Sequence, residues 1–190
     1  MEKTSVLRTD LSKYDNSWYQ PGSTFKRYAW FVLGRMVVNT YLPLPVGFKI
    51  AVLRLFGAQI AENVIIKPKV NIKYPWFLTV HKNAWIGEEV WIDNLTRVEI
   101  GANACLSQGA MLLTGNHNYK RPGFDLVVSP IVLEDGVWIG AKAIVCPGVV
   151  CGSHSVLTVN SVATKNLNAY GIYSGNPAQC IKTRKIESES

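Results

Sequence analysis

His117 stands where the sequence departs from its own pattern. The stretch around it, LLTGNHNYKRPGFDLVVSP at residues 112–130, interrupts a regular series of aliphatic residues. An imidazole with a pKa near about 6.5 can accept a proton and return it near neutral pH, and long loops in compact domains are often functional. His117 is therefore the first candidate for proton-transfer chemistry, although a lone histidine more often has a structural role.

The residues on either side of that stretch repeat with a period of six. This period matches neither an α-helix, at about 3.6 residues per turn, nor a plain alternating strand. It predicts a solenoid of about five coils over residues 60–168, in which short strands joined by turns stack aliphatic side chains inside a triangular prism. The aliphatic positions are Ile60, Ile66, Ile72, Val80, Ile86, Ile92, Ile100, Leu106, Leu112, Leu133, Ile139, Val145, Cys151, Leu157 and Ala163.

The N-terminal part, residues 1–57, differs from the repeat region at 58–190. Ser23 or Thr24 can cap a helix over the apolar run 28–38, and a second short helix over about 46–56 stops at Gly57. The first run is too short to span a membrane. It packs against the protein or a sister subunit, or it rests on a membrane as an amphipathic segment. In the second case the residues facing anionic headgroups are Lys26, Arg27, Arg35, Lys49 and Arg54.

The overall composition narrows the classes of partner. The chain has 190 residues, 48% of them hydrophobic, and a formal net charge of +7. Such a charge can attract nucleic acid, an anionic membrane or a phosphorylated small molecule, but no nucleic-acid module is present and the basic residues are spread along the chain. The four cysteines form no CxxC pair and are interpreted as buried apolar residues in a reducing compartment. No secretory signal is visible, so cytoplasmic residence is the expectation.

An ordered set of motifs over residues 74–184 resembles the hexapeptide-repeat acyltransferases. The matching stretches are YPWFLTV, VWIDNLTRVEIGANACLSQGA, LLTGNHNY, SPIVLEDGVWIGAKAIVCPGV and YSGNPAQCIKTRK. Within that family the chain is similar to the colanic-acid-type O-acetyltransferases and, more distantly, to the maltose and galactoside acetyltransferases. The resemblance implies an all-β, left-handed parallel β-helix with an N-terminal helical segment and an extruded loop. The general rule for parallel crossovers would have predicted the right-handed form.

The resemblance also implies an activity and an assembly. The family members transfer an acetyl group from acetyl-CoA to a sugar hydroxyl, here of an exopolysaccharide or its precursor, without a metal, in active sites between the subunits of a homotrimer. His117 matches the general base. Asp93 and Asn94 match the acceptor-binding region, although such residues also occur in turns for conformational reasons. Ser107 and Gln108 are expected to orient His117 or the acceptor, and Tyr119 follows the histidine.

The donor residues implied by the resemblance lie in the later coils and the C-terminal segment. The amide of Ala141 is the candidate oxyanion donor, and Trp138 either flanks the site or covers a subunit seam. Relatives often carry Arg or Lys where Gln179 stands, so the phosphate contact is expected to depend more on Lys182. The alternative is that the basic C-terminal tail is simply solvated. The full set is Trp138, Gly140, Ala141, Val159, Thr164, Lys165, Gln179, Lys182, Arg184 and Lys185.

Other chemistries fit the sequence less well. The γ-type carbonic anhydrases share this fold and hold zinc with three histidines, but His81, His117 and His154 occupy different phases of the repeat, so no metal is expected. Serine or cysteine nucleophile chemistry is disfavoured because the loop holds no cysteine and no GxSxG elbow is present. The open alternatives are a non-catalytic β-helix scaffold and an acetyltransferase with a different small-molecule acceptor.

Overall fold

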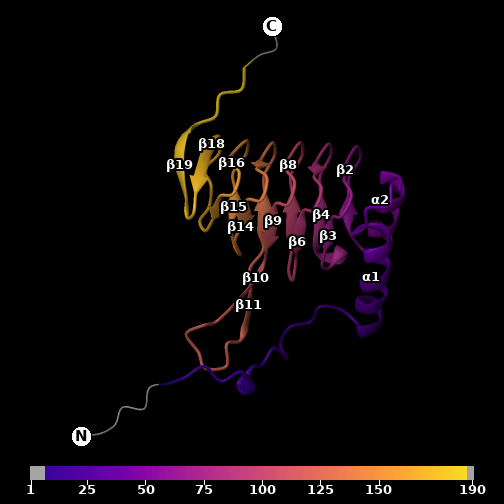
Figure 1. Cartoon of the computed structure of the whole chain (residues 1–190), viewed down its shortest axis with the longest axis vertical. Coiled ribbons are helices and arrows are strands. Elements are labelled where there is room, and N and C mark those ends of the chain that lie inside the picture. Colours follow the sequence, from indigo (N-terminus) through magenta and orange to yellow (C-terminus); the bar gives the residue numbers. More distant parts are fainter. Residues whose placement is uncertain (1–6, 188–190) are drawn as a thin grey trace, which may run out of the picture.

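The chain winds into a triangular prism whose three faces are β-sheets (Figure 1). The computed structural model describes residues 7–187. Sheet A contains β1 (Gln59–Ile60), β4 (Leu78–Val80), β7 (Val98–Ile100), β12 (Ile131–Leu133) and β15 (Val150–Cys151). Sheet B contains β2 (Ile65–Ile66), β5 (Trp85–Ile86), β8 (Cys105–Leu106), β13 (Trp138–Ile139), β16 (Val156–Leu157), β18 (Gly171–Gly175) and β19 (Ala178–Thr183). Sheet C contains β3 (Asn71–Ile72), β6 (Trp91–Asp93), β9 (Met111–Leu113), β14 (Ile144–Val145) and β17 (Val162–Ala163).

The period of six produces the core of this prism. Each full coil contributes one strand to sheets A, B and C in turn, and successive coils pair in parallel with Ile60 opposite Val80 and Val80 opposite Ile100. Every aliphatic position of the repeat is buried, as the sequence predicted. Each buried side chain of this size contributes about 1.5–3 kcal/mol of hydrophobic stabilisation. The fold is a left-handed parallel β-helix, as expected.

The solenoid has about six turns rather than the expected five. After β17 the chain still makes a parallel bridge from Leu167 to Cys151 in sheet A, and β18 then pairs in parallel with β16. β19 folds back antiparallel on β18 and ends the solenoid. The last turn was missed because its residues no longer follow the six-residue spacing.

The turns between strands form three corners, named here for the sheets that they join. The AB corner includes residues 101–104 and 134–137, the BC corner includes 107–110 and 140–143, and the CA corner includes 94–97, 114–130 and 164–166. At the AB corner Asn63, Asn83 and Asn103 stand at the same place in successive coils, each with φ between 56° and 58°. Asparagine tolerates this left-handed conformation better than most residues, which explains its recurrence.

Two helices close the N-terminal end of the prism. In α1 (Thr24–Val37) the Ser23 side chain accepts a hydrogen bond from the Lys26 amide, and α2 (Val46–Leu55) stops just before Gly57, so both predicted helix boundaries are confirmed. The Trp30 indole donates to the Ile72 carbonyl over 2.9 Å. One continuous apolar cluster joins the helices to the first coils. Across the described residues, no helix is long and apolar enough to cross a membrane.

The basic side chains expected to face a membrane differ in their exposure. Lys49 is 2% exposed, and its ammonium lies 3.4 Å from the Lys67 carbonyl oxygen. The Arg54 guanidinium donates to the Ile60 carbonyl over 2.6 and 3.1 Å. The prediction is wrong for Lys49, which is buried, whereas Arg54 stays exposed while its guanidinium binds the backbone of the first coil. Lys26 lies against Trp76, with its ammonium 4.4 Å from the ring centroid.

The cysteines differ in burial. Cys151 is fully buried in the prism, and burial raises the pKa of its thiol to about 12. Cys105 and Cys146 are half-buried. Cys180 lies on β19 and is exposed, which contradicts the prediction that all four are buried, because β19 is the outermost strand of sheet B.

Candidate active site

The stretch that breaks the repeat is an extruded hairpin at the CA corner. Two short strands, β10 (Gly115–His117) and β11 (Leu126–Val128), pair antiparallel and place Gly115 opposite Val128 and His117 opposite Leu126. The hairpin projects well beyond the prism wall (Figure 1). The predicted loop is thus confirmed, and its paired strands give His117 a defined position.

His117 is held in one tautomer by the tip of the hairpin. Its Nδ1 lies 2.9 Å from the Phe124 carbonyl oxygen. A carbonyl oxygen only accepts hydrogen bonds, so Nδ1 must carry the proton, and in the neutral ring Nε2 keeps its lone pair. The imidazole also stacks on the Phe124 ring, with centroids 4.4 Å apart and planes at 8°. The half-buried ring is therefore prepared to act as a base at Nε2.

The polar leader before α1 runs along this hairpin, a contact that the sequence did not predict. Figure 1 shows the chain passing beneath the hairpin before it enters α1. The Asp10 amide donates to the Pro122 carbonyl over 2.8 Å, and the Tyr19 hydroxyl donates to the Leu95 carbonyl over 2.5 Å. The Tyr14 ring lies 6.0 Å from that of His117. The sequence feature that could have indicated this packing is the aromatic-rich stretch YDNSWY, because buried tyrosines need partners for their hydroxyl groups.

Leader, hairpin and prism enclose a cavity of about 690 Å³ that contains both His117 and Asp93 in its wall. Asp93 ends β6, and the Lys73 ammonium lies 3.1 Å from its Oδ1. A carboxylate in the same cavity as a base is a suitable partner for a hydroxyl-bearing ligand. The structure thus brings together two of the residues proposed from the sequence. Lys73 and Tyr14, which also line this cavity, were not foreseen.

Asn94 does not belong to this cavity. Its side chain is fully buried; Oδ1 accepts from the Lys73 and Tyr74 amides over 3.1 and 3.0 Å, and Nδ2 donates to the Tyr74 carbonyl over 2.6 Å. The amide therefore fixes the turn of the preceding coil. This position contradicts the prediction that Asn94 contacts the acceptor.

Other predicted acceptor residues lie elsewhere on the molecule. Tyr119 is 73% exposed on the hairpin, two residues after His117. Ser107 and Gln108 lie at the BC corner, where Ser107 accepts a hydrogen bond from the Trp138 indole over 2.9 Å. Within one chain they are not placed to orient His117, because the BC and CA corners are at different edges of the prism.

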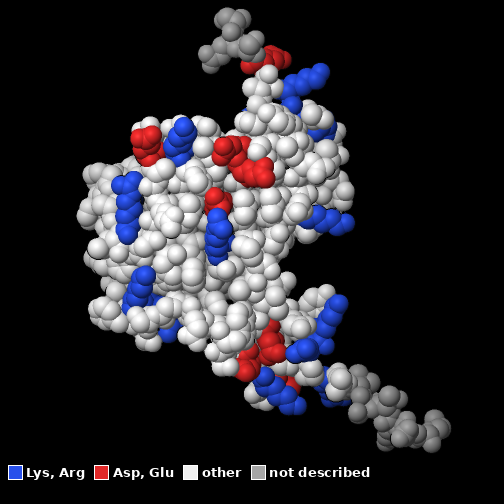
Figure 2. All heavy atoms as spheres, turned by 180° about the vertical axis from the view of Figure 1, so that it is seen from behind, with Lys and Arg blue, Asp and Glu red and all other residues white. Residues whose placement is uncertain are grey.

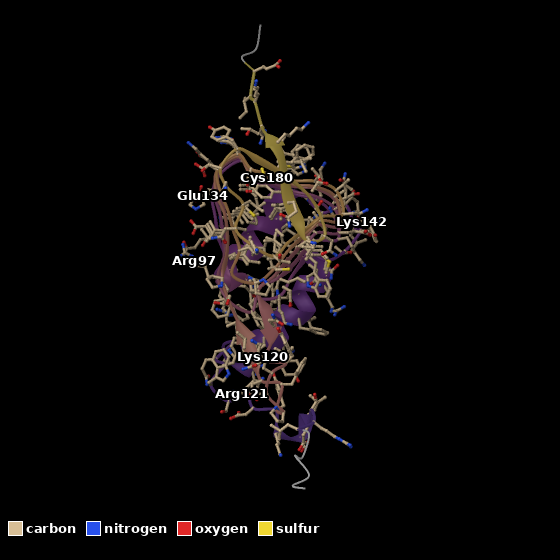
Figure 3. The ribbon with its side chains drawn as sticks, turned by 90° about the vertical axis from the view of Figure 1, so that its left-hand side faces the viewer. Arg97, Lys120, Arg121, Glu134, Lys142 and Cys180 are labelled. Carbon is tan, nitrogen blue, oxygen red and sulfur yellow. The ribbon has the colours of Figure 1, made fainter. Side chains whose placement is uncertain are left out.

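The predicted donor residues also divide among the corners. Gly140, Ala141 and Val159 lie together at the BC corner, where a Cβ on Gly140 would stand 2.7 Å from the Val159 nitrogen. Within the described part of the chain, the Ala141 N–H donates no hydrogen bond and is free for an oxyanion. Figure 3, viewed along the prism, shows Lys142 of this corner well apart from Lys120 and Arg121 on the hairpin.

The remaining donor candidates are more dispersed. Thr164 and Lys165 are exposed at the CA corner, beyond the hairpin along the prism. The exposed side chains of Gln179 and Lys182 are on β19, and Lys185 follows this strand. Arg184 turns instead to the AB corner, where its Nη1 donates to the Gly136 and His154 carbonyls over 3.1 and 3.2 Å. Arg184 is thus partly occupied by backbone carbonyls.

Within residues 7–187, the other two histidines lie in separate contacts. No group of three His, Cys, Asp or Glu side chains within residues 7–187 could hold a metal ion. His81 pairs with Glu99 at 2.9 Å, and His154 packs on Tyr170 with ring centroids 4.9 Å apart. On the face shown in Figure 2, lysines and arginines are scattered among neutral residues rather than gathered into a basic stripe.

Comparison with known proteins identifies the family. The chain is 34% identical over 171 residues to the colanic acid biosynthesis acetyltransferase WcaF of Escherichia coli (strain K12), covering 90% of this chain and 93% of WcaF. No family model matches the chain. The chain belongs to the hexapeptide-repeat acetyltransferases, and it is an acyltransferase.

Solved structures share the fold. The hexapeptide-repeat acetyltransferase VCA0836 of Vibrio cholerae, in complex with acetyl coenzyme A, superposes with a TM-score of 0.78 at 21% identity, covering 88% of this chain and 93% of that chain. A maltose O-acetyltransferase of Clostridium difficile 630 gives a TM-score of 0.76 at 24% identity, covering 85% and 88% of the two chains.

Proposed function

We propose that this protein transfers an acetyl group from acetyl-CoA to a sugar hydroxyl of an exopolysaccharide or its precursor. The observation that carries the proposal is the hydrogen bond from His117 Nδ1 to the Phe124 carbonyl, in a cavity that also contains Asp93. This bond prepares Nε2 as a general base. The similarity to WcaF, named for colanic acid biosynthesis, supports the class of acceptor. VCA0836 bound to acetyl coenzyme A supports the donor.

The reaction follows from these groups. Nε2 of His117 takes the proton of the sugar hydroxyl while the oxygen attacks the thioester carbonyl. The negative charge moves to the carbonyl oxygen, where the free N–H of Ala141 is the proposed donor. The tetrahedral intermediate then expels the coenzyme A thiolate, the imidazolium returns its proton to sulfur, and the products are the acetyl ester and free coenzyme A.

We further propose that the site is completed between subunits of a homotrimer. Within one chain, the BC corner with Ala141 and Val159, and Trp138 on the adjoining β13, belong to a different edge of the prism from the CA corner with His117; Figure 3 shows this separation at Lys142 of the BC corner and Lys120 of the hairpin. The BC corner of one subunit facing the hairpin of the next would bring donor and base together. Thr164, Lys165, Gln179, Lys182 and Lys185 stay proposed contacts to the phosphates and the pantetheine arm.

We also propose that the protein contacts a membrane surface, mainly through the apolar outer face of α1. The outer face of α1 exposes large apolar side chains, including Phe25 at 84% and Met36 at 61%. With Lys49 buried, this apolar surface and the exposed Arg35 and Arg54 carry the interaction. Flotation with anionic lipid vesicles tests this membrane contact. The wild-type protein should rise with the vesicles, and a Phe25→Gln, Met36→Gln double variant should remain in the bottom fraction. Cytoplasmic residence stays a prediction.

The experiment that tests the function is thioester consumption from acetyl-CoA across a panel of sugars and lipid-linked glycans. A sugar that supports turnover by the wild type, with loss of that turnover in His117→Ala, supports the proposal. Absence of turnover together with absence of coenzyme A binding would favour the non-catalytic scaffold instead.

A further inference from the structure

A second hollow adjoins the cavity that contains His117. It has a volume of about 510 Å³ and lies between α1 and sheet C. The two hollows share Thr24, Arg27, Lys73, Tyr74 and Asp93 in their walls. The two hollows are therefore neighbours with a common wall; together they are called here the α1 groove, which extends from His117 to the outer surface of α1.

The middle of the α1 groove is charged and incompletely paired. Lys73 forms an ion pair with Asp93 at 3.1 Å. Arg27 has no such counterion in the part of the chain that the structure describes; its Nη2 donates to the Thr24 hydroxyl over 3.2 Å. Its Nε is buried and finds no hydrogen-bond partner among the described residues. A buried donor without a partner is unusual in a native structure, and a guanidinium matches the geometry of a phosphate well. The middle of the groove is thus suited to a phosphate group.

The outer end of the α1 groove is aromatic. Tyr28 and Phe31 from α1 face Trp91 from β6 in its wall, and these side chains are 69%, 56% and 41% exposed. Beyond the groove, α1 also exposes Val32 and Met36, which follow Tyr28 at intervals of four residues and so lie on the same side of the helix. Contiguous exposed apolar surface of this kind marks a binding site for an apolar partner. It extends beyond the groove that a nucleobase would fill, which favours a hydrocarbon chain.

The order of these three regions points to one class of acceptor. Resting on the acetyl transfer proposed above, we infer that the acceptor sugar is joined through a phosphate to a long hydrocarbon chain. The sugar lies beside His117 and Asp93, the phosphate is bound by Arg27, and the chain leaves along Phe31 and Trp91. The exposed face of α1 would then receive the lipid where it emerges from a membrane.

Binding of simple probes to the full-length protein tests this inference without knowledge of the sugar. The probes, kept below their aggregation concentrations, are farnesyl phosphate, farnesol and uridine diphosphate, titrated by calorimetry. Farnesyl phosphate should bind at least about tenfold more tightly than either of the others, because only it combines phosphate and chain. Arg27→Gln should remove this preference for the phosphate, and Phe31→Gln should weaken binding of both farnesyl probes. The matched control Arg121→Gln, on the hairpin outside the groove, should bind like the wild type.

Three other results of the binding experiment would each contradict the inference. Tighter binding of uridine diphosphate would identify a nucleotide-linked acceptor, and equal binding of farnesol would show that no phosphate is recognised. An unchanged affinity in Arg27→Gln would remove the proposed phosphate site. Coenzyme A binding, measured on the same variants, verifies that they are folded. If coenzyme A binds and farnesyl phosphate does not, the groove assignment fails while the acetyltransferase proposal stands; if neither binds, both fail.

Discussion

His117 donates its Nδ1 proton to the backbone carbonyl of Phe124, 2.9 Å away, at the tip of the same hairpin. The partner is a main-chain group, so the orientation of the ring depends on the path of the hairpin rather than on a second titratable side chain. The stacked Phe124 ring adds a second constraint on the imidazole. The base and its orienting group therefore belong to one local element.

The separation of the BC and CA corners predicts complementation between inactive subunits. His117→Ala removes the base, and Val159→Glu, at an exposed position, places a negative charge where the phosphate-bearing donor should pass. In a randomly mixed trimer with sites between neighbours, a site has both intact halves with a probability of about one quarter. Mixed trimers, formed by co-expression, should therefore recover about a quarter of the wild-type acetyl transfer. No recovery in verified mixed trimers would indicate that each chain contains its own complete site.

The Tyr19 hydroxyl should hold the leader against the prism. Its bond to the Leu95 carbonyl is 2.5 Å long, and burial raises the pKa of the phenol, so the hydroxyl remains a donor at neutral pH. Tyr19→Phe should cost about 1 kcal/mol of local stability and raise trypsin cleavage in the leader about fivefold. Tyr170→Phe, at the AB corner, is the control. Equal cleavage of all three proteins would show that this bond does not restrain the leader.

The Asn94 side chain should stabilise the folded protein. Asn94→Ala leaves the amides of Lys73 and Tyr74 and the carbonyl of Tyr74 without their side-chain partner. Unsatisfied buried groups of this kind should lower the free energy of unfolding by about 2–4 kcal/mol in a urea titration. Gln59→Ala, exposed on β1, should change it by less than about 0.5 kcal/mol. A loss as small as that of Gln59→Ala would contradict the structural role.

Lys49 should destabilise the folded protein at neutral pH. Burial lowers the pKa of its ammonium below the ordinary value of 10.5. The unfolded chain therefore binds more protons across the interval between these pKa values, and stability rises with pH there. Lys49→Met should raise the free energy of unfolding by about 1 kcal/mol at neutral pH, and the difference from wild type should shrink as the pH approaches 10.5. Lys142→Met, at an exposed position, should show neither effect; a loss of stability in Lys49→Met would contradict the account.

The sequence predicted what depends on regular spacing. The aliphatic residues from Ile60 to Ala163 are buried at every predicted position, because a period of six places them all on the inside of the prism. His117 was found because it interrupts that period. Gly57 and Ser23 marked helix boundaries through local backbone chemistry, which acts over a few residues.

Contacts between distant segments were not predictable in this way. Nothing in the spacing shows that the leader packs on the hairpin, since Asp10 and Pro122 are far apart in the chain. The residue type alone did not show that Asn94 is directed inward, whereas its neighbour Asp93 reaches the cavity. Arg27 was assigned to a membrane-facing helix, but it lines the α1 groove because α1 lies across sheet C.

The central claim is that His117 removes the proton from the acceptor hydroxyl. The most direct measurement is the rate of formation of acetylated sugar from isotopically labelled acetyl-CoA, by mass spectrometry, for wild type and His117→Ala, with coenzyme A binding measured on both. The account predicts a loss on the order of 10²-fold or more in product formation with coenzyme A affinity unchanged. Retention of the wild-type rate in His117→Ala would contradict it.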